Sequence, residues 1–165
     1  MSLREILSDV RTFEGVLELA PTPGSEHPEI SWGDHYFYYA PDGLVPRTRQ
    51  PYATIVTKDY PGDTLSKLDP DERWRLNIHV GTEVFVDLLG YRPSEIDESA
   101  PDHSAADVFT PHPLYGAQGW VCVVNPGPRT LERARELLRG AHLADRRRVE
   151  RRSGRHRDKT DERRN

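Results

Sequence analysis

The spacing of apolar residues along the chain predicts three helices. Apolar positions that recur three or four residues apart mark one face of a helix, and they do so over residues 3–13, over residues 82–89 and from Thr130 onward. The three apolar faces consist of Leu3, Ile6, Leu7 and Val10, then Val84, Phe85, Leu88 and Leu89, then Leu131, Ala134, Leu137, Leu138 and Ala141. The third face fades beyond Arg146.

Five shorter segments have the composition of β-strands. They are rich in aromatic and β-branched side chains and cover residues 16–20, 35–40, 52–58, 74–80 and 119–124. Most connections between them are too short to contain crossover helices, which favours antiparallel pairing. The sequence therefore predicts an α+β domain with a largely antiparallel five-stranded sheet and helices packed on one face.

Acidic and basic residues are unevenly distributed along the 165-residue chain. Residues 1–128 carry 9 Lys or Arg and 20 Asp or Glu, a net charge of −11, whereas residues 129–165 carry 14 and 7, a net charge of +7. We expect a single domain over residues 1–145 and a disordered, arginine-rich tail over residues 146–165, because charge runs at chain ends are commonly solvated. The alternative interpretation is a tail that contacts nucleic acid.

The sequence disfavours several classes of protein. Its single cysteine, Cys122, lies in the apolar run WVCVV and cannot form an internal disulfide. The opening MSLREILSDV lacks the pattern of a signal peptide, and no apolar run is long enough to span a membrane. We expect a cytoplasmic protein with no membrane partner. We also expect neither a metal nor another cofactor, because motifs such as H-E-x-x-H and C-x-x-C do not occur.

Several phrases of the sequence together resemble a known family. They are WGDHYFYYAPDG, PYATIVTKDYPGD, RLNIHVG, PHPLYGAQGWVCVVNPG and LLRGAH. As a set they resemble an actinobacterial family known only as domain of unknown function 6194, which implies no established activity. The order of elements, with Trp120 in the last strand before the final helix, is also distantly similar to the MmcQ/YjbR-like proteins. That resemblance implies a small antiparallel sheet flanked by helices, and a DNA-binding role has been suggested for that group.

The segment KDYPGD ends the strand over residues 52–58 with a lysine, two aspartates and a turn. Lys58, Asp59 and Asp63 could bind a divalent cation together with a phosphate group. Alternatively, the aspartates accept backbone hydrogen bonds, Pro61-Gly62 forms a type II turn, and the lysine lies along the strand end. If this segment is functional, Lys58 is our first choice as the anchor of an anionic group.

The strand over residues 74–80 has a polar face. Arg75, Asn77 and His79 alternate with apolar residues, so their side chains project from the same side of the sheet. This stripe is either the floor of a ligand pocket or a plain solvent-exposed face. A pocket needs a cover, which the long loop over residues 91–113 could supply.

A third group of candidates lies near the end of that loop and just after it, namely Asp107, His112, Tyr115, Gln118 and Trp120. His112 stands between two prolines and is therefore held stiffly. Beside Asp107 and Tyr115 it could act as a general base or as a ligand. The alternative is that the prolines shape the entry to the last strand while the aromatic rings pack.

These motifs do not combine into a complete catalytic set, so we prefer a binding module as the function. Its partner would be a small anionic ligand or another protein. The first alternative is a small enzyme that uses His79 or His112 as acid or base and Lys58 as the anchor of an anion. The second alternative is nucleic-acid binding through the basic tail.

Overall fold

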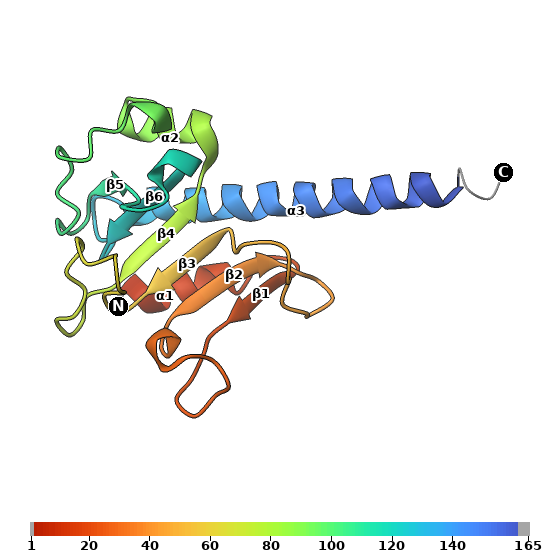
Figure 1. Ribbon diagram of the computed structural model, residues 1–165, viewed down its shortest axis with the longest axis horizontal. Coiled ribbons are helices and arrows are strands. Elements are labelled where there is room, and N and C mark those ends of the chain that lie inside the picture. The colour runs from red at the N-terminus through yellow and green to blue at the C-terminus, as the bar shows by residue number, and fades with distance from the viewer. Residues whose placement is uncertain (1, 162–165) are drawn as a thin grey trace.

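The computed structural model describes the backbone of residues 2–161 and the side chains of residues 3–155, and this part of the chain is an α+β protein (Figure 1). Its helices are α1 (Ser2–Val10), α2 (Gly81–Leu89) and α3 (Leu131–Asp161). Its strands are β1 (Val16–Leu19), β2 (His35–Tyr39), β3 (Ala53–Val56), β4 (Arg75–His79), β5 (Phe109–Pro111) and β6 (Trp120–Val124). Short 3₁₀ turns, η1 (Glu29–Ser31), η2 (Pro93–Glu95) and η3 (Gly116–Gln118), lie in the connections.

The strands form one antiparallel sheet in the order β1-β2-β3-β4-β6-β5. The sheet therefore has six strands rather than the predicted five. The additional strand is β5, which pairs with β6 at the edge of the sheet, within a stretch that the sequence suggests is a loop. It has only three residues and ends in Pro111, a residue type that is confined to edges and strand ends because it has no N–H. So short a strand has no recognisable periodicity of its own.

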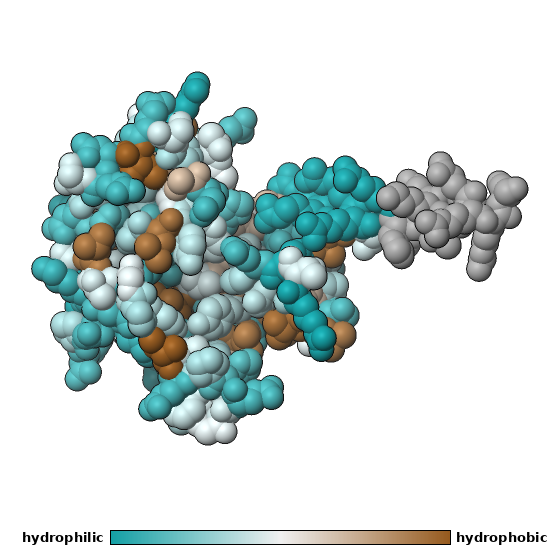
Figure 2. Space-filling model, viewed as in Figure 1, coloured by the Kyte–Doolittle hydropathy of each residue, from teal (hydrophilic) through white to brown (hydrophobic). Residues whose placement is uncertain are grey.

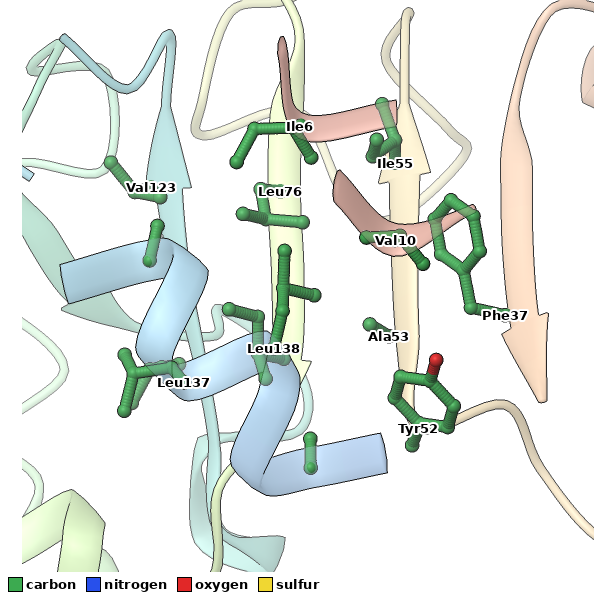
Figure 3. Close-up of a cluster of buried hydrophobic side chains, with 14 of the residues drawn as sticks. Ile6, Val10, Phe37, Tyr52, Ala53, Ile55, Leu76, Val123, Leu137 and Leu138 are labelled. Atoms are coloured by element: carbon green, nitrogen blue, oxygen red, sulfur yellow. The ribbon is translucent and has the colours of Figure 1, made fainter. Parts of the chain in front are cut away.

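The helices cover one face of the sheet, as the sequence predicts. Figure 3 shows Ile6 and Val10 of α1 and Leu137 and Leu138 of α3 pointing toward the strands. Phe85 of α2 belongs to the same buried cluster. The sheet contributes Phe37, Ala53, Ile55, Leu76, Ile78, Val121 and Val123. Full burial of such a side chain stabilises a fold by about 1.5–3 kcal/mol, so this layer is the main source of stability.

Loops cover the centre of the other face of the sheet. The loop between β3 and β4 places Leu68, which is 2% exposed, against Val56 and Val124. Next to this small apolar cluster, adjacent strands present one row of polar side chains. The row consists of Thr54, Asn77, Cys122 and Thr110. A polar layer is therefore enclosed between the sheet and its covering loops.

Helix α3 is the longest element and continues beyond the sheet (Figure 1). The projecting part is mainly hydrophilic on the face that Figure 2 shows. The helix runs to Asp161, past residue 145 where the sequence predicts a tail to begin. The division of the chain at residue 145 stays a prediction, and residues 162–165 of the predicted tail lie outside the described residues. None of the helices within residues 2–161 is long and apolar enough to cross a membrane.

Candidate functional site

Arg75 and Asn77, on the predicted polar face of β4, lie in a buried hydrogen-bond network. Arg75 is 1% exposed, and its guanidinium donates to both carboxylate oxygens of Asp63, at 2.9 and 2.6 Å. It also donates to Asn77 Oδ1 at 2.7 Å and to Ser66 Oγ at 2.9 Å. Burial opposes ionisation of Asp63, but the hydrogen bonds and charge of Arg75 outweigh it and lower the pKa of the carboxyl. Since Asp63 neutralises Arg75, this network holds the covering loop rather than an external anion.

His112 is buried beside the same guanidinium. Its Nδ1 lies 3.0 and 3.1 Å from the backbone N–H groups of Leu114 and Tyr115, so both ring nitrogens face donors, and whichever nitrogen carries the lone pair accepts from one of them. Nε2 lies 3.3 Å from Nη2 of Arg75. Burial, and then the charge of Arg75, lower the pKa of His112 to about 3. The one lone pair of this ring is occupied, so His112 does not have the arrangement of a general base.

The aromatic candidates lie beside two of the histidines. The rings of Tyr115 and His112 have centroids 4.8 Å apart, and Tyr115 is half exposed. Trp120 lies between His112 and His79, with centroid distances of 6.4 and 5.5 Å. Trp120 therefore connects the buried network around Arg75 with the open ends of β4 and β6.

Lys58 lies in a different cluster, at the end of β3. Its ammonium group donates to Asp34 Oδ1 and to the carbonyl of Trp32, both at 2.9 Å. The fully buried Asp34 also accepts hydrogen bonds from Thr57 and Tyr60. The ammonium of Lys58 thus compensates a buried carboxylate, which is a structural role.

Asp59 and the residues after it form a compact turn. The carboxylate of Asp59 accepts the N–H of Leu68 at 2.9 Å, and the N–H of Asp59 donates to Asp69 at 3.1 Å. Tyr60 and the residue three positions later exchange backbone hydrogen bonds at 3.2 and 2.9 Å. Gly62 has a φ of +79°, the value that a type II turn requires at its third position. The aspartates of KDYPGD are therefore engaged in turn and loop contacts.

Asp107 is also separate from His112, because it binds the start of α3. Its carboxylate accepts the N–H groups of Gly127, Arg129 and Thr130 at 2.8, 3.0 and 3.0 Å. It accepts the hydroxyl of Thr130 as well, at 2.6 Å. Burial raises the pKa of Asp107, but these hydrogen bonds outweigh that effect and lower it. This residue caps the helix from a distance.

His79 ends β4 and faces an open region. Its Nε2 donates to the carbonyl of Gln118 at 3.1 Å. The carbonyl of Gly119 accepts the N–H groups of Val80 and Gly81, at 3.0 and 3.2 Å, which holds the two strand ends together. Burial, and then the charge of Arg148, lower the pKa of His79.

A hollow of about 360 Å³ opens beside His79, between the strand ends, the segment before β3, and α3. Three of the predicted candidates, His79, Gln118 and Trp120, form part of its wall. Its charged residues are Arg49, Asp145, Arg148 and Arg152. We call this space the arginine hollow.

The charges of the arginine hollow do not balance. Asp145 is 2% exposed, accepts the N–H of Tyr39 at 2.9 Å and pairs with Arg49 at 2.5 Å. Arg148 approaches the other oxygen of this carboxylate only to 3.5 Å. With Arg152, three guanidinium groups share the hollow with one carboxylate. The local charge is therefore positive, although most of the body is acidic.

Sequence reasoning missed the charged residues of this hollow. Arg148 and Arg152 stand four residues apart, so they share a face of α3, and this spacing was the available signal. Arg49 and Asp145 are 96 positions apart, and nothing in the sequence pairs them. Within the described residues, no group of three His, Cys, Asp or Glu side chains could hold a metal ion.

These features define a class of protein, a small α+β domain with a polar layer under loops and a cationic hollow at one end of its sheet. The model of one family, described as a family of unknown function (DUF6194), matches residues 1–154, and the chain belongs to this family. The match includes α3 as far as Arg152 and thus the whole arginine hollow. No curated protein and no solved structure matches the chain.

Proposed function

We propose that this protein is a binding module that holds a small anionic ligand in the arginine hollow. The observation that carries the proposal is the grouping of Arg49, Arg148 and Arg152 around the single carboxylate of Asp145. Guanidinium groups recognise carboxylates and phosphates through planar, charged hydrogen bonds. The volume of about 360 Å³ lies within the range of small-molecule sites.

The arginines differ in how firmly they are engaged. Arg49 donates to Asp145 at 2.5 Å and to the carbonyl of Tyr39 at 2.7 Å, so it is a fixed part of the wall. Arg148 lies 3.5 Å from Asp145, at the edge of hydrogen-bond range. Arg148 is therefore the primary contact for the ligand, and Arg152, one helical turn further on, is the second.

The aromatic side of the hollow supports the same proposal. Trp120 and His79 present neighbouring rings, which offer apolar surface to the part of a ligand that is not charged. Sites for small molecules combine such surfaces with a few placed polar groups.

The alternative of a small enzyme has less support. Its candidate base His112 already uses its lone pair, and its candidate anchor Lys58 is paired with Asp34. His79 remains as an acid or base, but its neighbours in the hollow are arginines and Asp145 rather than a second catalytic group. We therefore propose binding without catalysis.

Thermal unfolding in the presence of phosphate, sulfate and acetate, at constant ionic strength in chloride, tests the proposal. A ligand at a hundred times its Kd adds about 2.7 kcal/mol, or several degrees in Tm for a chain of this size. Arg148→Gln should weaken binding by roughly tenfold, the value of one charged hydrogen bond of about 1.4 kcal/mol.

Arg151→Gln is the matched control for that variant. It removes the same charge from the same helix, but Arg151 is exposed and lies outside the hollow. Equal losses of anion affinity in the two variants would show that anions respond to the charge of the whole helix rather than to the hollow. That result, or the absence of a Tm shift with any anion, would contradict the proposal.

A second candidate function is nucleic-acid binding through the basic end of α3. The observation that favours it is that the helix leaves the body as a hydrophilic rod (Figures 1 and 2). Affinity for a short oligonucleotide should then fall steeply with salt and disappear on truncation after Asp145. Binding that survives truncation would reject this candidate.

Two finer assignments belong with these proposals. We propose a distant relation to the MmcQ/YjbR-like proteins, which the helices on one face of the sheet and Trp120 before α3 support. We also propose a cytoplasmic location, with which the buried free thiol of Cys122 is compatible.

A further inference from the structure

A second hollow lies along α3 on the other side of His79 and Arg148. These two residues line both hollows, so the two spaces meet at a shared wall. The second hollow also has a volume of about 360 Å³. Its apolar lining comes from the start of α2 and from α3, and consists of Val80, Val84, Leu137, Ala141 and Ala144. We call it the apolar hollow.

Gly140 contributes to the openness of the apolar hollow. It lies within α3 at the wall of this space, and a Cβ atom placed on it would meet no other atom within 4 Å. Glycine is unfavourable inside a helix, and here a larger residue would occupy part of the hollow. The same helix therefore supplies Arg148 and Arg152 to the arginine hollow, and an open apolar stretch between charged residues to the apolar hollow.

The charges at the far end of the apolar hollow are already paired. Arg133 donates to Asp87 at 3.1 Å and to Glu136 at 2.9 Å. Arg148, at the shared wall, is held only at 3.5 Å by Asp145. Arg147, the residue before Arg148, also lines the apolar hollow, and its guanidinium donates to the carbonyl of Leu143 at 3.3 Å. An anion that enters the apolar hollow is therefore drawn toward Arg147 and Arg148 and not toward the paired charges at the far end.

From this arrangement we infer that the ligand is an amphipathic anion, with its charged head in the arginine hollow and its apolar body in the apolar hollow. The inference rests on the proposed function, because it assigns the ligand class of that same site. A carboxylate, a phosphate ester or a sulfate ester on an aliphatic or aromatic body shares the required chemistry. Arg148 would contact the head of each.

Calorimetric titration of the full chain with acetate, butyrate, hexanoate and octanoate tests the inference. Each methylene that enters the apolar hollow should tighten binding by about fourfold, until the hollow is filled. Hexyl phosphate and hexyl sulfate, measured beside hexanoate, distinguish the head groups. Equal affinities for acetate and octanoate would overturn the inference and leave the proposed function intact. Absence of binding for every anion would overturn both.

Gly140→Leu locates the apolar body. The position of the added Cβ is open, so the fold should persist, and the variant should bind acetate as the parent does while losing the gain in affinity for octanoate. Gly154→Leu is the matched control, because it lies in the same helix, also has open space around it and lines neither hollow. Undiminished octanoate affinity in Gly140→Leu, or equal losses in both variants, would overturn the inference.

Discussion

Asp63 and Arg75 are joined by two parallel hydrogen bonds, of 2.9 and 2.6 Å, beneath the loop that connects β3 and β4. The pair links the turn of KDYPGD to the centre of the sheet. The pair also explains one of the two aspartates in this turn, because Asp63 compensates the charge of Arg75, which is 1% exposed.

Asp63→Asn should lower the free energy of unfolding by about 3 kcal/mol or more, since it leaves a buried guanidinium without its counter-charge. Urea denaturation at neutral pH measures the change. Asp71→Asn, an exposed substitution in the same loop, should be nearly neutral. A loss below about 1 kcal/mol for Asp63→Asn would mean that water replaces the pair without penalty.

Stability should decrease as the pH falls from about 6.5 toward 3, partly because of His112. Burial and Arg75 lower its pKa to about 3 in the folded protein, whereas the unfolded chain binds a proton near pH 6.5. Between these values the unfolded state holds more protons, so the free energy of unfolding rises with pH. His79, His103 and His142 have lowered pKa values too and act in the same direction.

His112→Asn isolates this contribution. The amide oxygen of asparagine can accept the N–H groups that Nδ1 faces, but the residue does not titrate. Urea denaturation across this pH range should show a smaller slope for the variant than for the parent. Identical slopes would show that His112 is protonated in the folded state as easily as in the unfolded state.

Binding of an anion should raise the pKa of His79. The charge of Arg148 is, after burial, the next cause that lowers this pKa, and a negative ligand at Arg148 offsets that charge. By linkage, affinity should increase as the pH falls through the pKa of His79. Ring-proton NMR titrations with and without sulfate measure the shift. An unchanged pKa at saturation would place the anion away from His79.

Asp107→Ala should lower the free energy of unfolding by about 2 kcal/mol or more, because it leaves four hydrogen-bond donors at the start of α3 without their acceptor. Asp107 also has a φ of +58°, a conformation that asparagine tolerates better than alanine. Asp107→Asn should therefore be less destabilising than Asp107→Ala in urea denaturation. The reverse order would rule out the capping role.

Gly119→Ala should destabilise the protein more than Gly62→Ala. Both glycines have a positive φ, of +84° and +79°, so both substitutions carry the strain of about 1–2 kcal/mol that an L-residue meets there. A Cβ on Gly119 would also approach Gly81 Cα to 3.1 Å, whereas one on Gly62 meets nothing within 4 Å. Differential scanning calorimetry compares the stability of the two variants. Equal losses of stability would show that Gly119 and Gly81, next to the ends of β6 and β4, move apart at little cost.

The fold was largely predictable because its signals are local. Helical and strand spacing identified the three helices and five of the six strands, and Gly90, with a φ of +84°, ends α2 as a C-terminal cap should. The alternation in β4 correctly placed Arg75 and Asn77 on the face opposite Leu76. It could not indicate that this face is buried, since the covering loop is held by long-range contacts.

The candidate site was only partly predictable, because many of its contacts join residues that are far apart in the sequence. His79 was identified in the polar stripe of β4, and Gln118 and Trp120 in a separate group before the last strand; the pairing of β4 with β6 brings them together. Lys58 and Asp107 were attractive as isolated motifs, but their partners Asp34 and Thr130 lie 24 and 23 positions away. The distinction between a catalytic and a structural charged residue depends on such partners.

The position of α3 after all six strands has a consequence for synthesis. All six strands are complete at Val124, yet Leu137 and Leu138 cover β4 and β6 only after translation has passed them. Until then, only α1 and α2 can cover this face of the sheet, and the part of the central strands that α3 covers is exposed. A ribosome-bound chain that stops at Val124 should therefore remain protease-sensitive and available to chaperones, and the sheet should become stable only as α3 emerges.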